Sequence, residues 1–135
     1  MINFEKKYFV KFDFTNEQIK RNYYNAVKDY DIAKKVDILE VKFNYTYTSF
    51  LKACITLISL YSQKARSIPG HHIKIIEKTS DILYDESISI MGNIMRTRRN
   101  LNFYSEAEIE VTEKECKEYM EFTLRVLNVI KKRIL

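Results

Sequence analysis

The chain almost lacks the two residue types that interrupt regular structure. Pro69, Gly70 and Gly92 are its only proline and glycine residues in a length of 135, whereas an average sequence carries about 12% of the two types. Because tight turns depend on glycine and proline, this composition argues against a turn-rich β-sandwich or barrel. It also excludes nucleotide binding through a glycine-rich loop, since neither the three-glycine dinucleotide fingerprint nor a P-loop can be formed.

Hydrophobic periodicity instead predicts an all-α protein, an antiparallel bundle of four to five helices with a short N-terminal extended arm. Apolar residues recur at helical spacing over about 16–36, 39–65, 71–83, 86–102 and 112–133. Thr15 with Gln18, and Thr112 with Glu115, have the spacing of capping boxes at the start of the first and last helices. We therefore divide the chain into an arm, 1–14, and a helical bundle, 15–135.

The predicted arm has the pattern of a strand. Val10, Phe12 and Phe14 alternate with Lys11 and Asp13, which is the period-2 pattern of extended chain. A single strand needs a partner for its backbone donors and acceptors. We therefore expect the arm to pack on the bundle or on a second subunit; a short first helix is the alternative.

No part of the sequence is typical of a membrane span or a signal peptide. The longest apolar-leaning run, 50–61, contains Lys52 and is shorter than the roughly 18 to 20 residues that a membrane span needs. The N-terminal residues lack an apolar region with a cleavage site. These features predict a cytoplasmic protein that makes no membrane contact. Cys54 and Cys116 stand alone in apolar stretches, which predicts two core residues.

Three arginines form the most distinctive feature of the sequence. The net charge is +5, and Arg96, Arg98 and Arg99 place three guanidinium groups within four positions. On a helix, Arg96, Arg99 and Asn100 share one face, whereas Arg98 lies on a more apolar side. The planar donors of arginine pair well with phosphate oxygens. Arg96, Arg99 and Asn100 are therefore a candidate site for phosphate or nucleic acid.

The arginines also have a purely structural explanation. Residues 105–121 hold seven Glu and only two Lys, so this acidic segment follows the basic helix end directly. In this alternative, the arginines stabilise the C-terminal end of their helix and pair with Glu106, Glu108 or Glu110.

The order of these features resembles the HEPN superfamily of small α-helical domains, which includes a standalone type paired with minimal nucleotidyltransferases. The likeness spans about 15–133. It includes a tyrosine-rich first helix, the run Tyr45–Phe50 in the second, and Gly70-His71-His72 at the start of the third. The basic helix end 96–104, an acidic loop and a capped last helix complete it.

The resemblance implies a homodimer in which each subunit brings an Arg-x4-6-His motif to a shared cleft. In active members this cleft cuts RNA without a metal: a 2′-hydroxyl attacks the adjacent phosphate, His moves protons and Arg stabilises the charged phosphorane. Matched to this sequence, the motif implies Arg99 and Tyr104 as catalytic residues, with Asn100 as the polar residue after the arginine. No cofactor is implied.

Tyr104 stands where the family has its histidine. A phenol has a pKa of about 10, so only about one in a thousand would be deprotonated at pH 7. This departure predicts impaired or absent cleavage. The resemblance also suggests Tyr104 as an acceptor of adenylate groups, as in toxins paired with nucleotidyltransferases.

The two histidines of the chain are His71 and His72. Arg66 and His71 also have Arg-x4-His spacing, but Pro69 lies between them and we attribute this spacing to coincidence. We expect the pair to cap the third helix and to bond to neighbouring residues. As metal ligands they are weak candidates, because adjacent helical residues point about 100° apart and no third ligand follows at a suitable spacing.

The aromatic residues point to packing more than to base stacking. The chain has ten Tyr and eight Phe, which could offer stacking platforms for unpaired bases. The helical stripes, however, include the tyrosines at 23, 30, 47, 61 and 119. We therefore expect these five in the core or in a dimer interface.

Three functions compete. The first is an RNA- or nucleotide-binding homodimer of a toxin-antitoxin or defence system, with impaired or absent ribonuclease activity. The second is a metal-independent endoribonuclease in which Arg99 stabilises the phosphorane and Tyr104, or a His71 brought in by folding, moves the proton. The third is a structural partner that docks a nucleotidyltransferase through the acidic segment 105–121.

Overall fold

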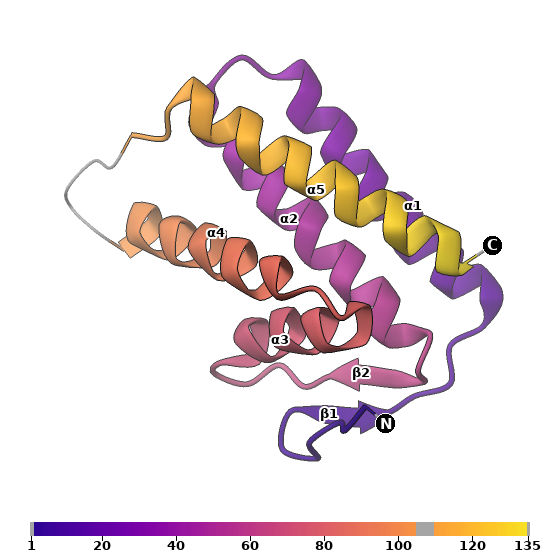
Figure 1. Ribbon diagram of the computed structural model, residues 1–135. Helices are drawn as coiled ribbons and strands as arrows, with labels where there is room; N and C mark the ends of the chain where they lie inside the picture. Colours follow the sequence, from indigo (N-terminus) through magenta and orange to yellow (C-terminus); the bar gives the residue numbers. More distant parts are fainter. Residues whose placement is uncertain (1, 105–109, 135) are drawn as a thin grey trace.

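The structure is a computed structural model that describes residues 2–104 and 110–134, with side chains described for 2–100 and 110–134. The described chain forms five helices and one small two-stranded sheet (Figure 1), which confirms the predicted all-α class. The elements are β1 (Phe9–Lys11), α1 (Asn16–Lys35), α2 (Leu39–Ser59), β2 (Gln63–Ala65), α3 (His71–Leu83), α4 (Glu86–Tyr104) and α5 (Glu113–Ile134).

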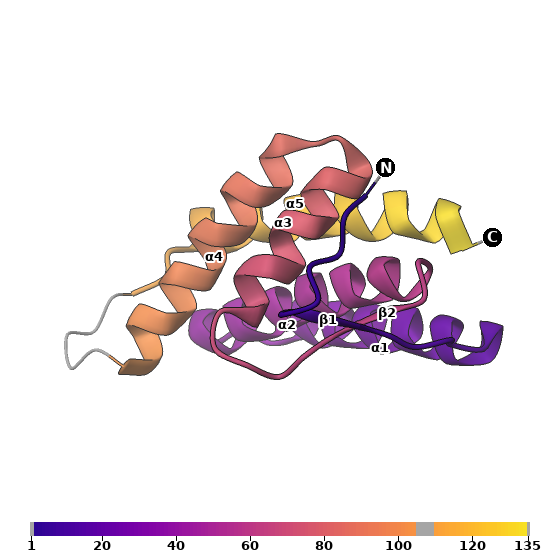
Figure 2. The ribbon, with the colours of Figure 1, turned by 90° about the horizontal axis from the view of Figure 1, so that it is seen from below.

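Helix α2 is the centre of the fold. It packs against all four other helices, and Figures 1 and 2 show α1 and α5 running along it while α3 and α4 cover its remaining side. Its own side chains supply much of the core, since Phe43, Phe50 and Leu57 are fully buried. A helix surrounded in this way is apolar on most of its circumference, which explains the broad apolar stripe in its sequence.

Both predicted capping boxes are present. At the start of α1, the backbone N–H of Gln18 donates to Thr15 Oγ1 (3.1 Å) and that of Thr15 to Gln18 Oε1 (2.9 Å). At the start of α5, Thr112 and Glu115 exchange the same pair of bonds, at 3.1 and 3.2 Å. These side chains satisfy backbone donors that have no partner inside the helix.

The prediction of one helix over 39–65 is wrong at its end. Helix α2 stops at Ser59, Ser62 takes a left-handed conformation (φ 56°), and Gln63–Ala65 forms β2. Strand β2 pairs antiparallel with β1, with Phe9 opposite Ala65. The apolar pattern predicts helix here because a pattern within 39–65 carries no information about β1, whose backbone needs a partner strand. The described residues before α1, from 2 onward, contain this strand and no helix.

A buried lysine connects the N-terminal residues to α3. Lys78 is only 6% exposed, and its Nζ donates to Glu5 Oε1 (2.6 Å) and to the carbonyl of Asn3. The hydrogen bond from Lys78 lowers the pKa of Glu5. A buried cation that kept no anionic partner would be strongly unfavourable, so this pair holds residues 3–5 beside the middle of α3.

Helices α3 and α4 form a hairpin with a two-residue turn. Tyr84 takes the left-handed conformation (φ 51°), and Asp85 then caps α4 by accepting the N–H of Ser87 (3.0 Å). Arg125 of α5 pairs with the other carboxylate oxygen of Asp85 (2.9 Å). The turn is therefore tied to the rest of the molecule, and α4 returns alongside α3.

Close packing also fixes the hairpin against α2. A Cβ atom at Gly92 would lie 2.8 Å from Ile76 Cγ2 and 2.9 Å from Phe50 Cζ, so only glycine permits this approach of α4. The two cysteines, Cys54 and Cys116, are buried and free, as predicted.

The tyrosine predictions hold in part. Tyr30, Tyr47 and Tyr119 are buried, and Tyr23 packs partly buried against the core. Tyr61 follows the end of α2 and is 39% exposed, so it lies outside the core, and its place in a dimer interface stays a prediction.

Candidate anion-binding site

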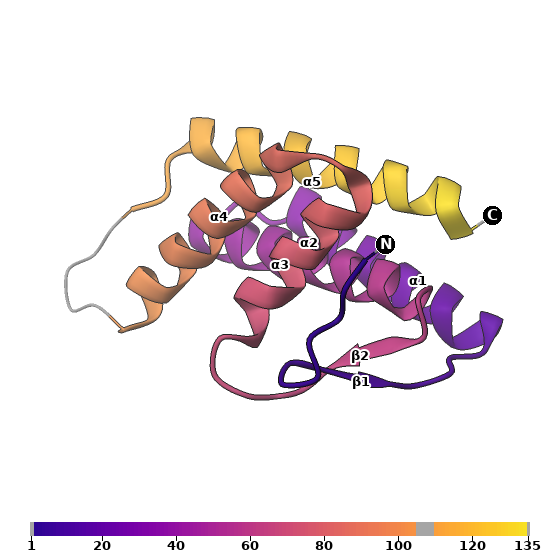
Figure 3. The ribbon, with the colours of Figure 1, turned by 60° about the horizontal axis from the view of Figure 1, so that its bottom comes forward.

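An open cavity of about 540 Å³ lies where the start of α3 meets the C-terminal half of α4. Figure 3 shows the two elements and the loop that leads from β2 into α3. We call this site the arginine cavity. Its lining residues are Ser67, Ile68, Pro69, Gly70, His71, His72, Ile73, Arg96, Arg99 and Asn100.

The structure brings three of the four predicted site residues together. Arg96, Arg99 and Asn100 all line the arginine cavity, because their spacing places them on the same face of α4. The side chain of Tyr104 lies outside the described residues, and so do residues 105–109 of the acidic segment.

A buried tyrosine supports Arg99. Tyr47 of α2 is only 1% exposed, and the Cζ atom of Arg99 lies 5.5 Å from the centroid of its ring. A guanidinium over an aromatic face is attracted by the ring electrons. Arg96 is held differently, since its Nε donates to Asn93 Oδ1 at 3.2 Å. This bond uses one of the five N–H donors of a guanidinium.

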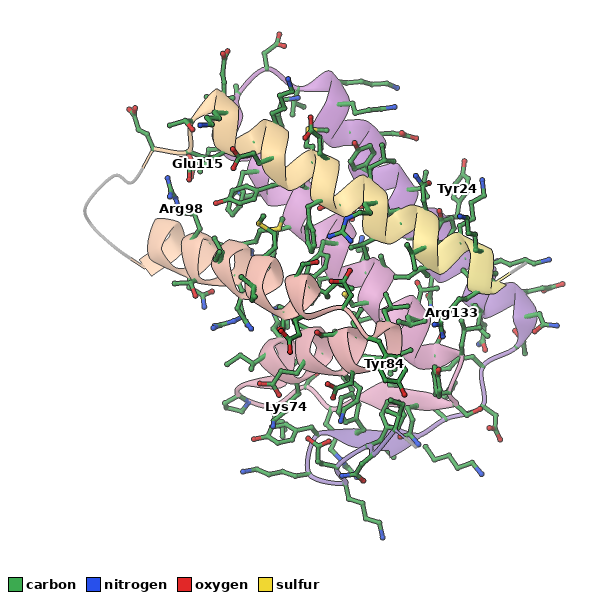
Figure 4. All side chains as sticks on the ribbon, in the orientation of Figure 1. Tyr24, Lys74, Tyr84, Arg98, Glu115 and Arg133 are labelled. Atoms are coloured by element: carbon green, nitrogen blue, oxygen red, sulfur yellow. The ribbon has the colours of Figure 1, made fainter. Side chains whose placement is uncertain are left out.

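Arg98 has a structural role on the opposite side of the helix. Its Nη1 lies 2.8 Å from Glu115 Oε2, and its Nη2 donates to Glu115 Oε1 (3.0 Å) and to the carbonyl of Glu110 (2.7 Å). Figure 4 shows Arg98 and Glu115 directed toward one another. Burial alone would raise the pKa of Glu115, but bonds from Thr112 and the charge of Arg98 lower it.

The ion-pair alternative therefore applies to Arg98, with a different partner from those expected. The carboxylate is that of Glu115, while Glu110 contributes its backbone carbonyl. Glu106 and Glu108 lie outside the described residues.

His71 has an orientation suited to accepting a proton. Its Nδ1 lies 2.7 Å from the carbonyl oxygen of Ile68. Because a carbonyl only accepts hydrogen bonds, Nδ1 carries the ring proton and Nε2 of a neutral ring keeps its lone pair. The His72 ring lies beside it, with 4.4 Å between the centroids.

His72 stays neutral at pH 7. Burial lowers its pKa to about 4, helped by the nearby charges of His71, Arg99 and Arg96. Its Nδ1 lies 3.3 Å from Tyr47 Oη, and burial raises the pKa of Tyr47 to about 12. The phenol therefore keeps its proton, which the neutral imidazole can accept in a hydrogen bond.

The charge of the arginine cavity favours an anion. Two guanidinium groups line it, and none of its lining residues in the described part of the chain is Asp or Glu. Arginine pairs bidentately with phosphate oxygens and stays charged when partly desolvated. The arrangement can therefore hold a phosphate group beside His71.

The part played by the histidines differs from the prediction. They were expected to cap α3, but the N-cap is Gly70, in the left-handed conformation (φ 83°), with no side-chain capping bond. The bonds between His71 and Ile68 and between His72 and Tyr47 agree with the expected bonding to neighbouring residues. Arg66 does not line the cavity, and its Nε donates to the carbonyl of Lys6 at 3.0 Å.

A signal for the histidines was present in the sequence. Two helices joined by a short turn at 84–85 place residues 71 and 72 opposite 97–98 if the hairpin is antiparallel. The two helices and their short link were predicted at nearly the observed positions, so this register placed the histidines near the arginines.

Three further observations bear on the function. No three His, Cys, Asp or Glu side chains gather to hold a metal ion in the described part of the chain. Over the same residues, no helix is long and apolar enough to cross a membrane. In comparisons with known proteins, no family model, curated protein or solved structure matches this chain.

Proposed function

We propose that this chain is a HEPN-like helical bundle that binds RNA, or a nucleotide, by holding a phosphate group in the arginine cavity. The observation that carries the proposal is the described lining of the cavity, in which Arg96 and Arg99 stand together with no Asp or Glu among the described residues. A phosphodiester supplies the negative charge and the acceptor oxygens that these groups lack. Asn100 adds a neutral amide that can bond to a sugar or a base.

The resemblance supplies the wider setting of the proposal. It comprises a homodimer, a toxin-antitoxin or defence system, and a nucleotidyltransferase as the partner protein. The close packing of α2 with the four other helices supports the bundle arrangement.

Metal-independent RNA cleavage is a second candidate, favoured by the bond between His71 Nδ1 and Ile68. This bond leaves Nε2 of a neutral ring free to take the proton of a 2′-hydroxyl. The 2′ oxygen then attacks the adjacent phosphorus, Arg99 stabilises the phosphorane charge, and the 5′ oxygen leaves with a proton from water. The products are a 2′,3′-cyclic phosphate and a 5′-hydroxyl. In this scheme His71, from another helix, fills the role that Tyr104 leaves open.

The test measures binding and cleavage of single-stranded RNA in EDTA. Arg99→Ala should weaken binding about 10- to 100-fold, because hydrogen bonds to a charged group contribute about 1.5–3 kcal/mol. Arg21→Ala is the matched control, since Arg21 is exposed on α1, away from the cavity lining. Equal binding by the wild type and both variants would refute the proposal.

Cleavage is tested with the same RNA. If the chain is a nuclease, His71→Gln abolishes the cyclic-phosphate product and keeps the RNA affinity, while Tyr104→Phe leaves cleavage unchanged. Loss of cleavage in Tyr104→Phe alone would instead assign the proton transfer to Tyr104. Absence of cleavage in the wild type, with binding that depends on Arg99, would establish a pure binding function.

A further inference from the structure

The small sheet has one face that does not contribute to the core. Phe9 is buried (2% exposed), so its strand neighbour Val10 points to the other face. The register places Val10 opposite Lys64, and directly opposite residues share a face. One step further, the N–H of Arg66 donates to the carbonyl of Tyr8 (2.7 Å), which places Arg66 opposite Tyr8.

We call this outer face the sheet platform. By the same alternation, Phe12 also belongs to it. Its members are Val10, Phe12, Lys64 and Arg66.

The sheet platform exposes apolar and aromatic surface between positive charges. Val10 and Phe12 are 39% and 42% exposed. The Nζ of Lys64 lies 5.5 Å from the centroid of the Phe12 ring. The Phe12 ring is thus bordered by a cation. Tyr8 packs partly buried against the core instead, and Lys74 beside it pairs with Glu5 and Glu77.

The sheet platform is continuous with the arginine cavity along the chain. Arg66, at the end of β2, directly precedes Ser67, which lines the cavity. On α3, Lys74 follows Ile73, another lining residue, and Figure 4 shows Lys74 near the turn that precedes β1. A ligand that left the cavity along the loop 66–70 would therefore reach the sheet platform.

We propose that the sheet platform binds the continuation of a single-stranded RNA whose phosphate lies in the arginine cavity. This inference rests on the proposed function and specifies its ligand as a strand of several nucleotides. An exposed base stacks on Phe12, while Lys64 and Arg66 contact the phosphates. Unpaired bases stack on aromatic side chains with little dependence on sequence, whereas the bases of a duplex are already stacked on one another.

A second copy of the chain is a less suitable occupant. In a two-fold symmetric interface the same patch faces itself, which would bring Lys64 and Arg66 against their own copies. The nearby turn adds the exposed Lys6 and Lys7. A single strand of RNA neutralises these positive charges, whereas a symmetric contact between two copies of the chain brings them together.

The experiment compares short and long oligouridylates by fluorescence anisotropy in EDTA. The variant is the double substitution Phe12→Ala/Lys64→Ala. Its matched control is Val129→Ala/Lys132→Ala, which removes an exposed apolar residue and an exposed lysine from α5. Lys64→Glu alone serves as a second variant that removes no apolar packing, and thermal unfolding checks that each variant is folded.

The expected result depends on oligonucleotide length. A 12-nucleotide strand should bind the double variant at least tenfold more weakly than the wild type, and the dependence of log affinity on log salt should flatten by about 0.7 for one lost phosphate contact. Binding of a trinucleotide should not change. Lys64→Glu should produce the same length-dependent loss, and the α5 control should bind both strands as the wild type does.

Several outcomes would overturn the sheet platform. One is equal binding of the 12-nucleotide strand to the wild type, the double variant and Lys64→Glu. Another is that the variants bind RNA as tightly as the wild type but no longer self-associate in light scattering. This result would assign the face to a second copy. A third is that the wild type binds the trinucleotide and the 12-nucleotide strand equally tightly, with binding that depends on Arg99. This outcome would leave the proposed function intact. If Arg99→Ala binds normally while the double variant does not, RNA binds the sheet platform without the arginine cavity, so the proposed function fails and the platform does not continue a strand held in the cavity.

Discussion

The α3–α4 hairpin has a closed end and an open end, and the two ends use similar residues for different purposes. At the closed end, Arg125 pairs with Asp85, and midway along the hairpin Gly92 lets α4 approach Ile76 closely. At the open end, Arg99 borders a cavity of about 540 Å³ that has no carboxylate among its described lining residues. An arginine therefore indicates a binding site only where the surrounding structure supplies no carboxylate partner.

Two adjacent arginines on α4 show the same contrast between a paired arginine and one that borders the cavity. Arg98 makes two contacts with the Glu115 carboxylate and one with a carbonyl, whereas Arg99 rests on the ring of Tyr47. The helical rotation between adjacent residues is about 100°, which is enough to separate a structural residue from a candidate binding residue.

The largest expected effect on stability is at Gly92, midway along the hairpin. Gly92→Ala should lower the free energy of unfolding by about 2 kcal/mol, because the new methyl group overpacks the contact with Ile76 and Phe50. Urea unfolding followed by circular dichroism measures the change. Thr97→Ala, exposed on the same helix, is the control and should stay within about 0.5 kcal/mol. Equal stability of Gly92→Ala and the wild type would mean that the hairpin is not closely packed here.

A smaller effect separates the two arginines. Arg98→Ala should lower the free energy of unfolding by about 1.5 kcal/mol, since Glu115 and the Glu110 carbonyl lose their donor. Arg99→Ala should lower it by only about 0.5 kcal/mol, from the lost cation–π contact. RNA affinity should have the reverse order, with Arg99→Ala the more damaging variant. The same order in both measurements would remove the distinction between a structural and a binding arginine.

The smallest effect is the pH dependence that His72 contributes. Its pKa is about 4 in the folded protein against a usual 6.5, so the unfolded chain takes up the proton first as pH falls. The stabilisation is complete above pH 6.5 and is lost toward pH 4. Between pH 7 and 5 we expect a loss of about 1 kcal/mol, after allowance for partial exposure of the ring.

The variant His72→Gln isolates this contribution. It keeps a polar group near Tyr47 and cannot titrate, so its stability should change less between pH 7 and 5 than that of the wild type. Thermal unfolding at several pH values provides the comparison. Saturating RNA should raise the pKa of His72, measured by NMR, because a bound phosphate offsets the charges of Arg96 and Arg99. Parallel pH profiles for the wild type and the variant would contradict the assignment.

The helices were readily predicted because their signals are local. Thr15 with Gln18 marks the start of α1, and Thr112 with Glu115 marks that of α5, where each capping bond spans only three residues. The end of α2 was missed because the strand 63–65 pairs with residues more than fifty positions earlier. No periodicity within 39–65 reports a partner at that distance.

For the candidate site too, the features that depend on neighbouring residues were predicted from the sequence, and those that depend on distant segments were not. The sequence by itself determined that Arg96, Arg99 and Asn100 share a helix face, since that depends only on the α-helical rotation per residue. It also determined, through the scarcity of glycine and proline, that the chain is helical. Only the tertiary structure decided that α3 and α4 pack side by side, which brings His71 and His72 to the same cavity, and that Arg98 has its carboxylate partner on α5. The reason is physical: helix periodicity depends on neighbouring residues, whereas ion pairs and cavities depend on which distant segments pack together.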